Sequence, residues 1–252
     1  MLKKRIIPIQ LLIDGRLVKT VNFDKYRDVG DPVASSRVYN SQYADELILL
    51  NINRGGRTVE PLLRVVEGIS EVCFMPLSLG GGVNSLKDAE LLIKYGADKV
   101  ILNSVCYTDK SVIEKITSKF GSQAAVVSID VRRHGSGFQL YADCGRRQEA
   151  ASLQDHIREC TRRGAGEILI NSIDQDGTMS GFDLPLIREV MAHCTLPVIA
   201  SGGAGTFSHL KDAFLETGVS ALACGSLFNF GDNNPIRAKA FLTNHGLPFK
   251  KV

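Results

Sequence analysis

The sequence predicts an α/β fold, a single (β/α)8 TIM barrel, and three observations support this prediction. Short apolar runs alternate with longer amphipathic segments along all 252 residues. The alternation occurs eight times, which is the number of strand–helix units in that barrel. The second half of the chain also resembles the first, which indicates a twofold internal repeat of two half-barrels, about residues 1–122 and 123–252. An open doubly wound sheet is the alternative, and the repeat favours the barrel.

Each unit contributes one strand and one helix. Strands are expected near residues 5–11, 46–51, 74–79, 98–103, 124–130, 167–172, 197–201 and 219–224. Helices are expected near residues 33–43, 58–70, 85–95, 109–119, 151–163, 183–192, 207–216 and 234–244. Pro76 and Pro197 lie at strand starts, where a missing backbone N–H is tolerated. The units leave no linker, so one domain of residues 1–252 is expected.

The internal repeat is visible in three pairs of segments. Residues 75–82 resemble 196–205, residues 96–104 resemble 218–226, and residues 45–50 resemble 166–171. The offset between the paired segments is 121 or 122 residues each time. Two four-unit halves fused in tandem would close into one barrel with pseudo-twofold symmetry.

The composition argues against several classes of protein. Hydrophobic residues make up 44% and charged residues 23%, which is ordinary for a globular domain. The net charge is +3 and the basic runs are short, so no nucleic-acid partner is expected. No apolar run approaches the roughly 18 residues of a membrane span. The N-terminus lacks the apolar stretch of a secretory signal, so a cytoplasmic protein without membrane association is expected.

Six cysteines are scattered along the chain, and none forms a C-x-x-C pair. They are Cys73, Cys106, Cys144, Cys160, Cys194 and Cys224. Several lie in apolar runs, which predicts buried thiols in a reducing compartment rather than disulfides or zinc ligands. No metal and no cofactor are expected.

Two segments are too long to be simple turns. Residues 12–31 follow the first strand, and residues 131–150 follow the fifth. They occupy equivalent places in the two halves. Long segments at the carboxyl ends of barrel strands commonly act as lids or binding loops. Within the second segment, residues 138–142 are expected to form part of a small hairpin.

Glycine-rich or small polar turns follow the third, fourth, seventh and eighth strands. They contain Gly82, Asn103, Ser104, Gly203, Gly225 and Ser226. Glycines let backbone amides approach an anion, and the start of the following helix adds a favourable dipole. A tight turn explains any single loop equally well. Two such arrangements on opposite sides of the barrel mouth predict a ligand with a phosphate at each end.

Acidic residues follow two further strands. Asp176 and Gly177 follow the sixth strand and form either a capped turn or part of the second phosphate site, and the phosphate site is favoured. Asp130 ends the fifth strand with its side chain expected to point inward. A carboxylate there suits a general acid or base, although a structural hydrogen-bond acceptor is the alternative. The matching position of the first strand is Leu11, 119 residues earlier.

Four charged residues lie at the opposite ends of the strands, with inward parity. They are Arg5, Glu46, Lys99 and Glu167. They are expected to form a ring that closes the barrel floor. Such a ring either stabilises the bottom face through salt bridges or plugs a passage through the barrel.

The chain resembles the HisF family, the cyclase subunit of imidazole glycerol phosphate synthase, nearly from end to end. The resemblance is carried by residues 4–7, 14–15, 30–32, 80–82, 96–100, 120–123, 163–169 and 200–205. It implies that a separate HisH-type glutaminase docks on the barrel floor. Ammonia would then pass through the barrel to a phosphorylated small-molecule ligand, a bis-phosphate, at the mouth.

The resemblance also implies roles for residues. The ring of Arg5, Glu46, Lys99 and Glu167 would be the ammonia gate. Lys19 would bind substrate, and Asp130 would be one catalytic carboxylate. The loops would bind one phosphate through Gly82, Asn103 and Ser104, and the other through Asp176, Gly177, Gly203, Gly225 and Ser226.

The sequence departs from that family at the first strand, where Leu11 replaces a second catalytic aspartate. The family's aspartate at the end of the second strand is here Asn51. Ring closure in the family uses two carboxylates of opposite protonation, and leucine can supply neither state. A sister barrel, the phosphoribosyl isomerase, also needs a carboxylate on the first strand, so it does not fit.

A HisF-like branch associated with surface-polysaccharide synthesis resembles the chain more closely, at residues 11–12 and 18–20. The resemblance implies a glutaminase and a third, sugar-modifying amidotransferase as partners, with ammonia entering an acetamidino group on a nucleotide-linked sugar. We therefore expect an ammonia-delivering subunit without the ordinary cyclase acid. The alternatives are a working cyclase of histidine biosynthesis and a non-catalytic activator of a glutaminase.

Overall fold

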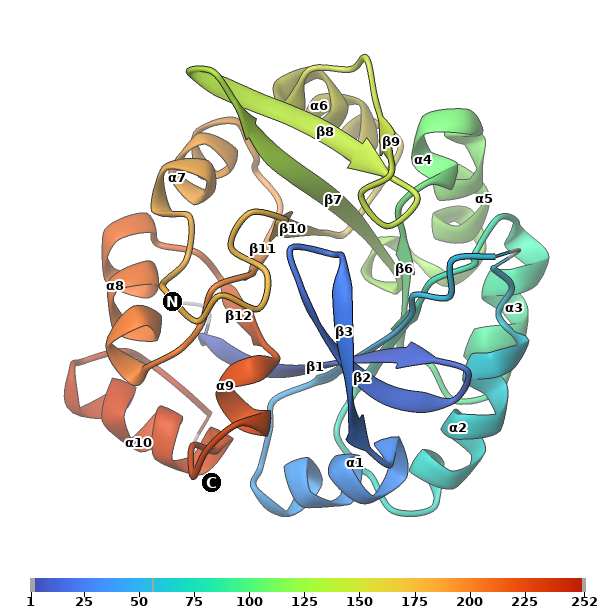
Figure 1. The fold of residues 1–252 in the computed structure, drawn as a ribbon. Coiled ribbons are helices and arrows are strands. Elements are labelled where there is room, and N and C mark those ends of the chain that lie inside the picture. Colours follow the sequence, from blue (N-terminus) through green and yellow to red (C-terminus); the bar gives the residue numbers. More distant parts are fainter. Residues whose placement is uncertain (1–2, 56, 251–252) are drawn as a thin grey trace.

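Eight parallel strands form a closed ring in the computed structural model, which describes residues 3–55 and 57–250 (Figure 1). In order around the ring they are β1 (Arg5–Ile13), β4 (Leu47–Asn51), β5 (Leu77–Gly80), β6 (Lys99–Leu102), β7 (Ala125–His134), β10 (Glu167–Ser172), β11 (Val198–Ser201) and β12 (Ala221–Cys224). Pairing of β12 with β1 and of β6 with β7 joins the two halves of the chain. The predicted (β/α)8 barrel is confirmed.

A helix follows each of these strands and packs on the outside of the barrel (Figure 1). The eight are α1 (Pro32–Ser41), α2 (Glu60–Ser70), α3 (Leu86–Lys94), α5 (Ser111–Phe120), α6 (Leu153–Arg162), α7 (Leu184–His193), α8 (Phe207–Thr217) and α10 (Pro235–Asn244). All eight were expected near these positions. Side-chain caps begin several of them; Asp31, for example, accepts from the Ala34 N–H at 2.7 Å.

Three short helical turns were not predicted. They are α4 (Val105–Thr108), α9 (Ser226–Asn229) and the 3-10 turn η1 (Ser122–Ala124). Each has at most four residues, which is too short to produce a helical pattern of apolar residues. Both α4 and α9 begin at the glycine-rich or polar turns of the barrel mouth.

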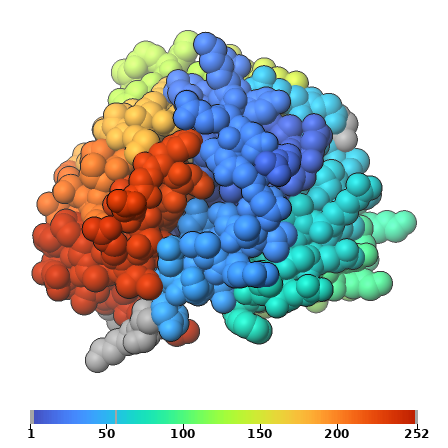
Figure 2. Space-filling view, turned by 60° about the horizontal axis from the view of Figure 1, so that its bottom comes forward, coloured from blue at the N-terminus to red at the C-terminus, as the bar shows by residue number. Residues whose placement is uncertain are grey.

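The long segment after the first strand is a hairpin rather than an irregular loop. β1 continues to Ile13, and β2 (Arg16–Val21) and β3 (Lys25–Gly30) fold back beside it. A tight turn at Asp14 and Gly15, both with positive φ, connects β1 to β2. The hairpin of β2 and β3 lies across the barrel opening in Figure 1. In Figure 2 these blue atoms pack directly beside the red C-terminal segments.

The second long segment also contains strands. β7 extends to His134 and pairs with β8 (Gly137–Ala142), which pairs in turn with β9 (Arg147–Gln148). The small hairpin expected around residues 138–142 is therefore confirmed. It stands at the side of the barrel mouth opposite α1 (Figure 1).

Buried apolar side chains form two separate clusters. One fills the space between the barrel and its helices and includes Ile6 and Leu12 of β1. The other fills the barrel interior and consists of Ile7, Ile9, Ile48, Ile101, Val126, Leu169, Ile199, Ala221 and Ala223, with Leu11 and Leu50 packed against it. Successive residues of β1 point alternately to the two clusters, as the pleat of a strand requires.

Four charged side chains close the lower end of the interior. Glu46 accepts from Arg5 Nη1 and from Lys99 Nζ, each at 2.8 Å. Glu167 accepts from Lys99 Nζ at 2.9 Å and also from Arg5 Nη2. Both carboxylates are buried, whereas the two cations are about a fifth exposed. The side chains thus form a closed cycle of alternating charge, as burial of ionised groups requires.

All six cysteines are free thiols, and four of them are buried. Within residues 3–55 and 57–250, no helix is long and apolar enough to cross a membrane.

Removing one cation from the ring should destabilise the fold. Arg5→Met leaves two buried carboxylates sharing Lys99, so we expect the free energy of unfolding to fall by about 3 kcal/mol. Adding Glu167→Gln to Arg5→Met leaves one cation, Lys99, paired with one anion, Glu46. The double variant should therefore recover part of the lost free energy of unfolding. Urea unfolding of the single and double variants measures both effects.

Arg188→Met provides the matched control, because Arg188 pairs with Glu216 on the exposed outer surface. We expect this substitution to lower the free energy of unfolding by about 0–1 kcal/mol. Equal losses for Arg5→Met and Arg188→Met would contradict a stabilising buried ring.

Candidate active site at the barrel mouth

The carboxyl ends of the barrel strands surround a cavity of about 490 Å³. Every residue that the sequence placed at the mouth lines it: Lys19, Gly82, Asn103, Ser104, Asp130, Asp176, Gly177, Gly203, Gly225 and Ser226. Leu11 and Asn51 line it as well. The four ring residues lie at the other end of the barrel, beyond the apolar interior. The structure therefore brings the predicted residues together as two separate groups.

Asp130 lines the mouth and is buried. Its Oδ1 accepts from Asn171 Nδ2 at 2.8 Å, and its Oδ2 accepts from Asn103 Nδ2 at 3.0 Å. Burial raises the pKa of this carboxyl to about 6, and the two amide donors and the Arg57 charge oppose the rise. A carboxyl group with that pKa can take or give a proton near neutral pH.

The first strand offers no acid to pair with Asp130. β1 presents Ile9, Leu11 and Ile13 to the cavity, and Leu11 lies beside Leu50 of β4. Among the described residues, Asp176 is the other largely buried carboxylate of the cavity. Burial raises its pKa, but its Oδ2 already accepts from Thr20 Oγ1 at 2.6 Å.

Lys19 extends from β2 into the mouth and is 5% exposed. Its Nζ donates to the Ile9 carbonyl at 2.5 Å. Burial lowers the pKa of this amine to about 8, against the opposing charge of Asp176. A Cβ placed on Gly225 would lie 2.7 Å from Nζ, so the ammonium group occupies the space beside that glycine.

The second predicted phosphate site contains Asp176 and Gly203, and the hairpin of β2 and β3 is held against it. The Asn22 backbone N–H donates to the Asp176 carbonyl at 3.0 Å, and the Phe23 N–H donates to the Asp176 carboxylate at 3.1 Å. Gly203 has a φ of +98°, and a Cβ there would lie 1.9 Å from the Gly181 carbonyl. The structure therefore needs glycine at 203 for loop packing, independently of any ligand.

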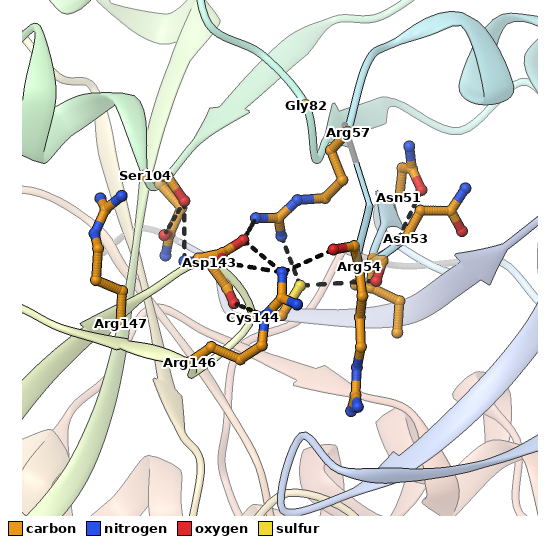
Figure 3. A network of polar contacts seen from close by, with 12 residues as sticks. Asn51, Asn53, Arg54, Arg57, Gly82, Ser104, Asp143, Cys144, Arg146 and Arg147 are labelled. Carbon is orange, nitrogen blue, oxygen red and sulfur yellow. Dashed lines mark hydrogen bonds and ion pairs between the residues drawn. The ribbon is translucent and has the colours of Figure 1, made fainter.

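The first predicted phosphate site contains Gly82, Asn103 and Ser104, and its neighbours differ from those of the second site (Figure 3). A Cβ on Gly82 would lie 2.6 Å from the Thr58 carbonyl, so this glycine too allows a close loop approach. The Ser104 hydroxyl accepts from the Asp143 backbone N–H at 3.1 Å. Asn103 donates to the Ser128 carbonyl as well as to Asp130.

Arginines line this side of the mouth, and the sequence predicted none of them. They are Arg54, Arg57, Arg146 and Arg147. In Figure 3, Arg57 lies beside Gly82 and points toward Asp143 and Cys144. A signal was available, because glycine–arginine runs follow the second strand at residues 54–57 and recur at 145–147. The four arginines come together only in the folded structure, so neither run alone predicts that they lie close to each other.

No group of three or more histidine, cysteine, aspartate or glutamate side chains in the described part of the chain is placed to hold a metal ion. Asp130, Asp176 and Lys19 are buried or largely buried titratable groups that line the cavity. Hydrogen bonding, proton transfer and anion binding are thus the chemistry that these side chains can supply.

Comparison with known proteins agrees with this architecture. The family model described as "Histidine biosynthesis protein" matches residues 5–234. The chain is 44% identical over 252 residues to a protein of Hyphomonas neptunium named imidazole glycerol phosphate synthase subunit HisF. That alignment covers 100% of both proteins. The chain therefore belongs to the HisF family of histidine biosynthesis proteins.

Proposed function

We propose that this chain is the ammonia-accepting subunit of a glutamine amidotransferase complex. A HisH-type glutaminase docks on the barrel floor, and ammonia travels through the barrel to the mouth. There it is used to amidinate a nucleotide-linked sugar for a surface polysaccharide of the O-antigen type, together with a third, sugar-modifying amidotransferase. The observation that carries this proposal is Leu11, which leaves Asp130 without a partner acid on β1.

The lower part of the barrel supports the delivery of ammonia. The ring of Arg5, Glu46, Lys99 and Glu167 is complete, and the interior above it is apolar. Ammonia is small and uncharged, so it can cross an apolar interior in which the ammonium ion would be costly. A paired ring of charges excludes ions and must rearrange for ammonia to enter, which is the role of a gate.

The mouth supports proton transfer during nitrogen addition. When ammonia adds to an electrophilic carbon, its nitrogen must lose a proton. Asp130 has the burial and the pKa of about 6 to accept that proton near neutral pH. Lys19 and the two glycine-rich loops supply a cation and backbone donors for a phosphorylated acceptor.

The second candidate is the cyclase of histidine biosynthesis, which the name of the Hyphomonas neptunium relative favours. Both predicted phosphate sites at the mouth also fit a bis-phosphate substrate. This candidate requires that another group replace the missing carboxylate of β1. Asp176 and Lys19 are largely buried titratable side chains of the same cavity, but Asp176 is engaged with the hairpin and Lys19 with β1.

A turnover assay separates the two candidates. Purified protein is supplied with ammonium and the bis-phosphate aminoimidazole precursor, beside Leu11→Asp and its uncharged control Leu11→Asn. Because an essential acid or base contributes about 10²–10⁴-fold, we expect negligible cyclisation by the unmodified chain and by Leu11→Asn, with a gain for Leu11→Asp. Cyclisation by the unmodified chain at a rate typical of enzymes would refute the amidination proposal.

Glutaminase coupling tests the delivery step. A HisH-type glutaminase should hydrolyse glutamine faster when the barrel is added, as measured by glutamate release. Binding of two inorganic phosphate ions at the Gly82 and Gly203 loops, seen in a crystal, is also expected. A barrel that stimulates the glutaminase but binds no anion would instead be a non-catalytic activator.

The pKa of Asp130 predicts a pH-dependent stability. A carboxyl whose pKa is higher in the folded state stabilises the fold at low pH, and this contribution is lost as pH rises through about 6. Asp130→Asn removes the ionisation. As pH rises from 4 to 7, the free energy of unfolding of the variant should therefore increase by on the order of 3 kcal/mol relative to that of the unmodified chain. Urea unfolding at both pH values measures the change, and parallel pH curves would contradict the raised pKa.

A further inference from the structure

Two loops that are far apart in the sequence meet over the Gly82 end of the mouth. One lies between β4 and α2 and carries Arg54 and Arg57; the other joins β8 to β9 and carries Arg146, with Arg147 at the start of β9. Figure 3 shows Arg57 beside Gly82 and Arg147 beside Ser104, with Arg54 and Arg146 farther from both. We call these four residues the arginine rim.

Hydrogen bonds tie the two loops of the rim together. Arg57 is the least exposed member, at 17% of its side chain, and donates to the Asp143 carboxylate and the Cys144 sulfur. Arg146 Nη2 donates to the Arg54 carbonyl at 2.9 Å and to the Asp143 carboxylate at 3.0 Å. Asp143 therefore holds two guanidinium groups in place.

The backbone at Asp143 is itself unusual. Asp143 and Cys144 have φ values of +54° and +55°, which non-glycine residues seldom adopt. This turn directs the Asp143 carboxylate toward Arg57, and it also places the Asp143 N–H on Ser104. The rim and the first predicted phosphate site are thus one connected structure.

The rim retains unused donors for a ligand. Arg147 bonds Glu149 only through Nε, and its two terminal nitrogens have no hydrogen-bond partner among the described residues. Arg54 bonds the carbonyls of Phe23 and Asp24 through one nitrogen. Four guanidinium groups face three carboxylates, those of Asp24, Asp143 and Glu149. Guanidinium forks suit phosphoryl oxygens in pairs.

Among the described residues that line the cavity, the opposite end of the mouth has no such group of arginines. There the buried cation is Lys19, and the hairpin occupies the carboxylate of Asp176. One phosphate monoester would need only the cradle formed by Gly82 and Ser104. Arg57 and Arg147 lie beside that cradle, so their donors are available to a second phosphoryl group (Figure 3).

We propose that the arginine rim and the Gly82 loop form a subsite for a diphosphate ester, the group present in a nucleoside diphosphate. One phosphoryl group occupies the Gly82–Ser104 cradle, and the adjoining one bonds Arg57 and Arg147. Asp143 is the internal competitor that holds Arg57 when the subsite is empty. The inference rests on the proposed function in placing the ammonia acceptor at this mouth.

Titration calorimetry with UDP and UMP as probes tests the subsite at one fixed ionic strength. UDP should bind the full chain at least about 10-fold more tightly than UMP, because the second phosphoryl group gains charge-assisted hydrogen bonds. Arg57→Ala should weaken UDP binding by about 10-fold or more. Asp143→Asn removes the competing charge, tolerates the positive φ and should tighten UDP binding severalfold.

Arg188→Ala is the matched control, because this arginine pairs with Glu216 far from the mouth, and it should leave UDP binding unchanged. If Arg57→Ala fails to fold, Arg147→Ala and Asp143→Asn still give opposite predicted changes. Equal affinity for UDP and UMP would overturn the subsite, as would UDP binding that is not tightened by Asp143→Asn. Glutaminase stimulation does not involve the rim, so its loss would instead count against the proposed function.

Discussion

The alternation of side chains along parallel strands in a closed barrel is the constraint on which the rest of this structure depends. Every second residue of a strand must enter an interior with no access to bulk water except at its two ends. On β1 the inward residues are Arg5, Ile7, Ile9 and Leu11. A charge is tolerated at the lower end only because the ring neutralises it. The apolar middle and the cavity follow from the same alternation.

The two ends of the mouth have diverged, although they occupy equivalent places in the repeat. Each has glycines whose missing side chains let neighbouring loops approach, and each has one cation with little exposure, Lys19 or Arg57. The hairpin closes over one end, and arginines from two loops surround the other. Such differences arise easily in this architecture, because the loops carry the binding groups while the strands hold them in position.

Much of the fold could be predicted because its signals are local. The eight apolar runs and eight amphipathic segments became eight strands and eight helices. β2 and β3 were not foreseen, because β2 includes the polar residues Lys19 and Thr20, which become buried only when the hairpin folds onto the mouth. The residues of the cavity were predicted from their places at strand ends, whereas their individual roles stay predictions. Arg57 and Asp143 could not be paired from sequence, since 86 residues separate them.

The contact between Lys19 and Gly225 has an evolutionary consequence. The ammonium group fills the volume that a Cβ at position 225 would occupy, so a side chain there would displace the end of Lys19 from the Ile9 carbonyl. A larger residue at 225 would therefore favour either a moved lysine or a shorter residue at 19, and a shorter residue at 19 would leave room for a side chain at 225. In related proteins these two positions should therefore covary, and their joint pattern would trace which members of the family keep a cation inside the mouth.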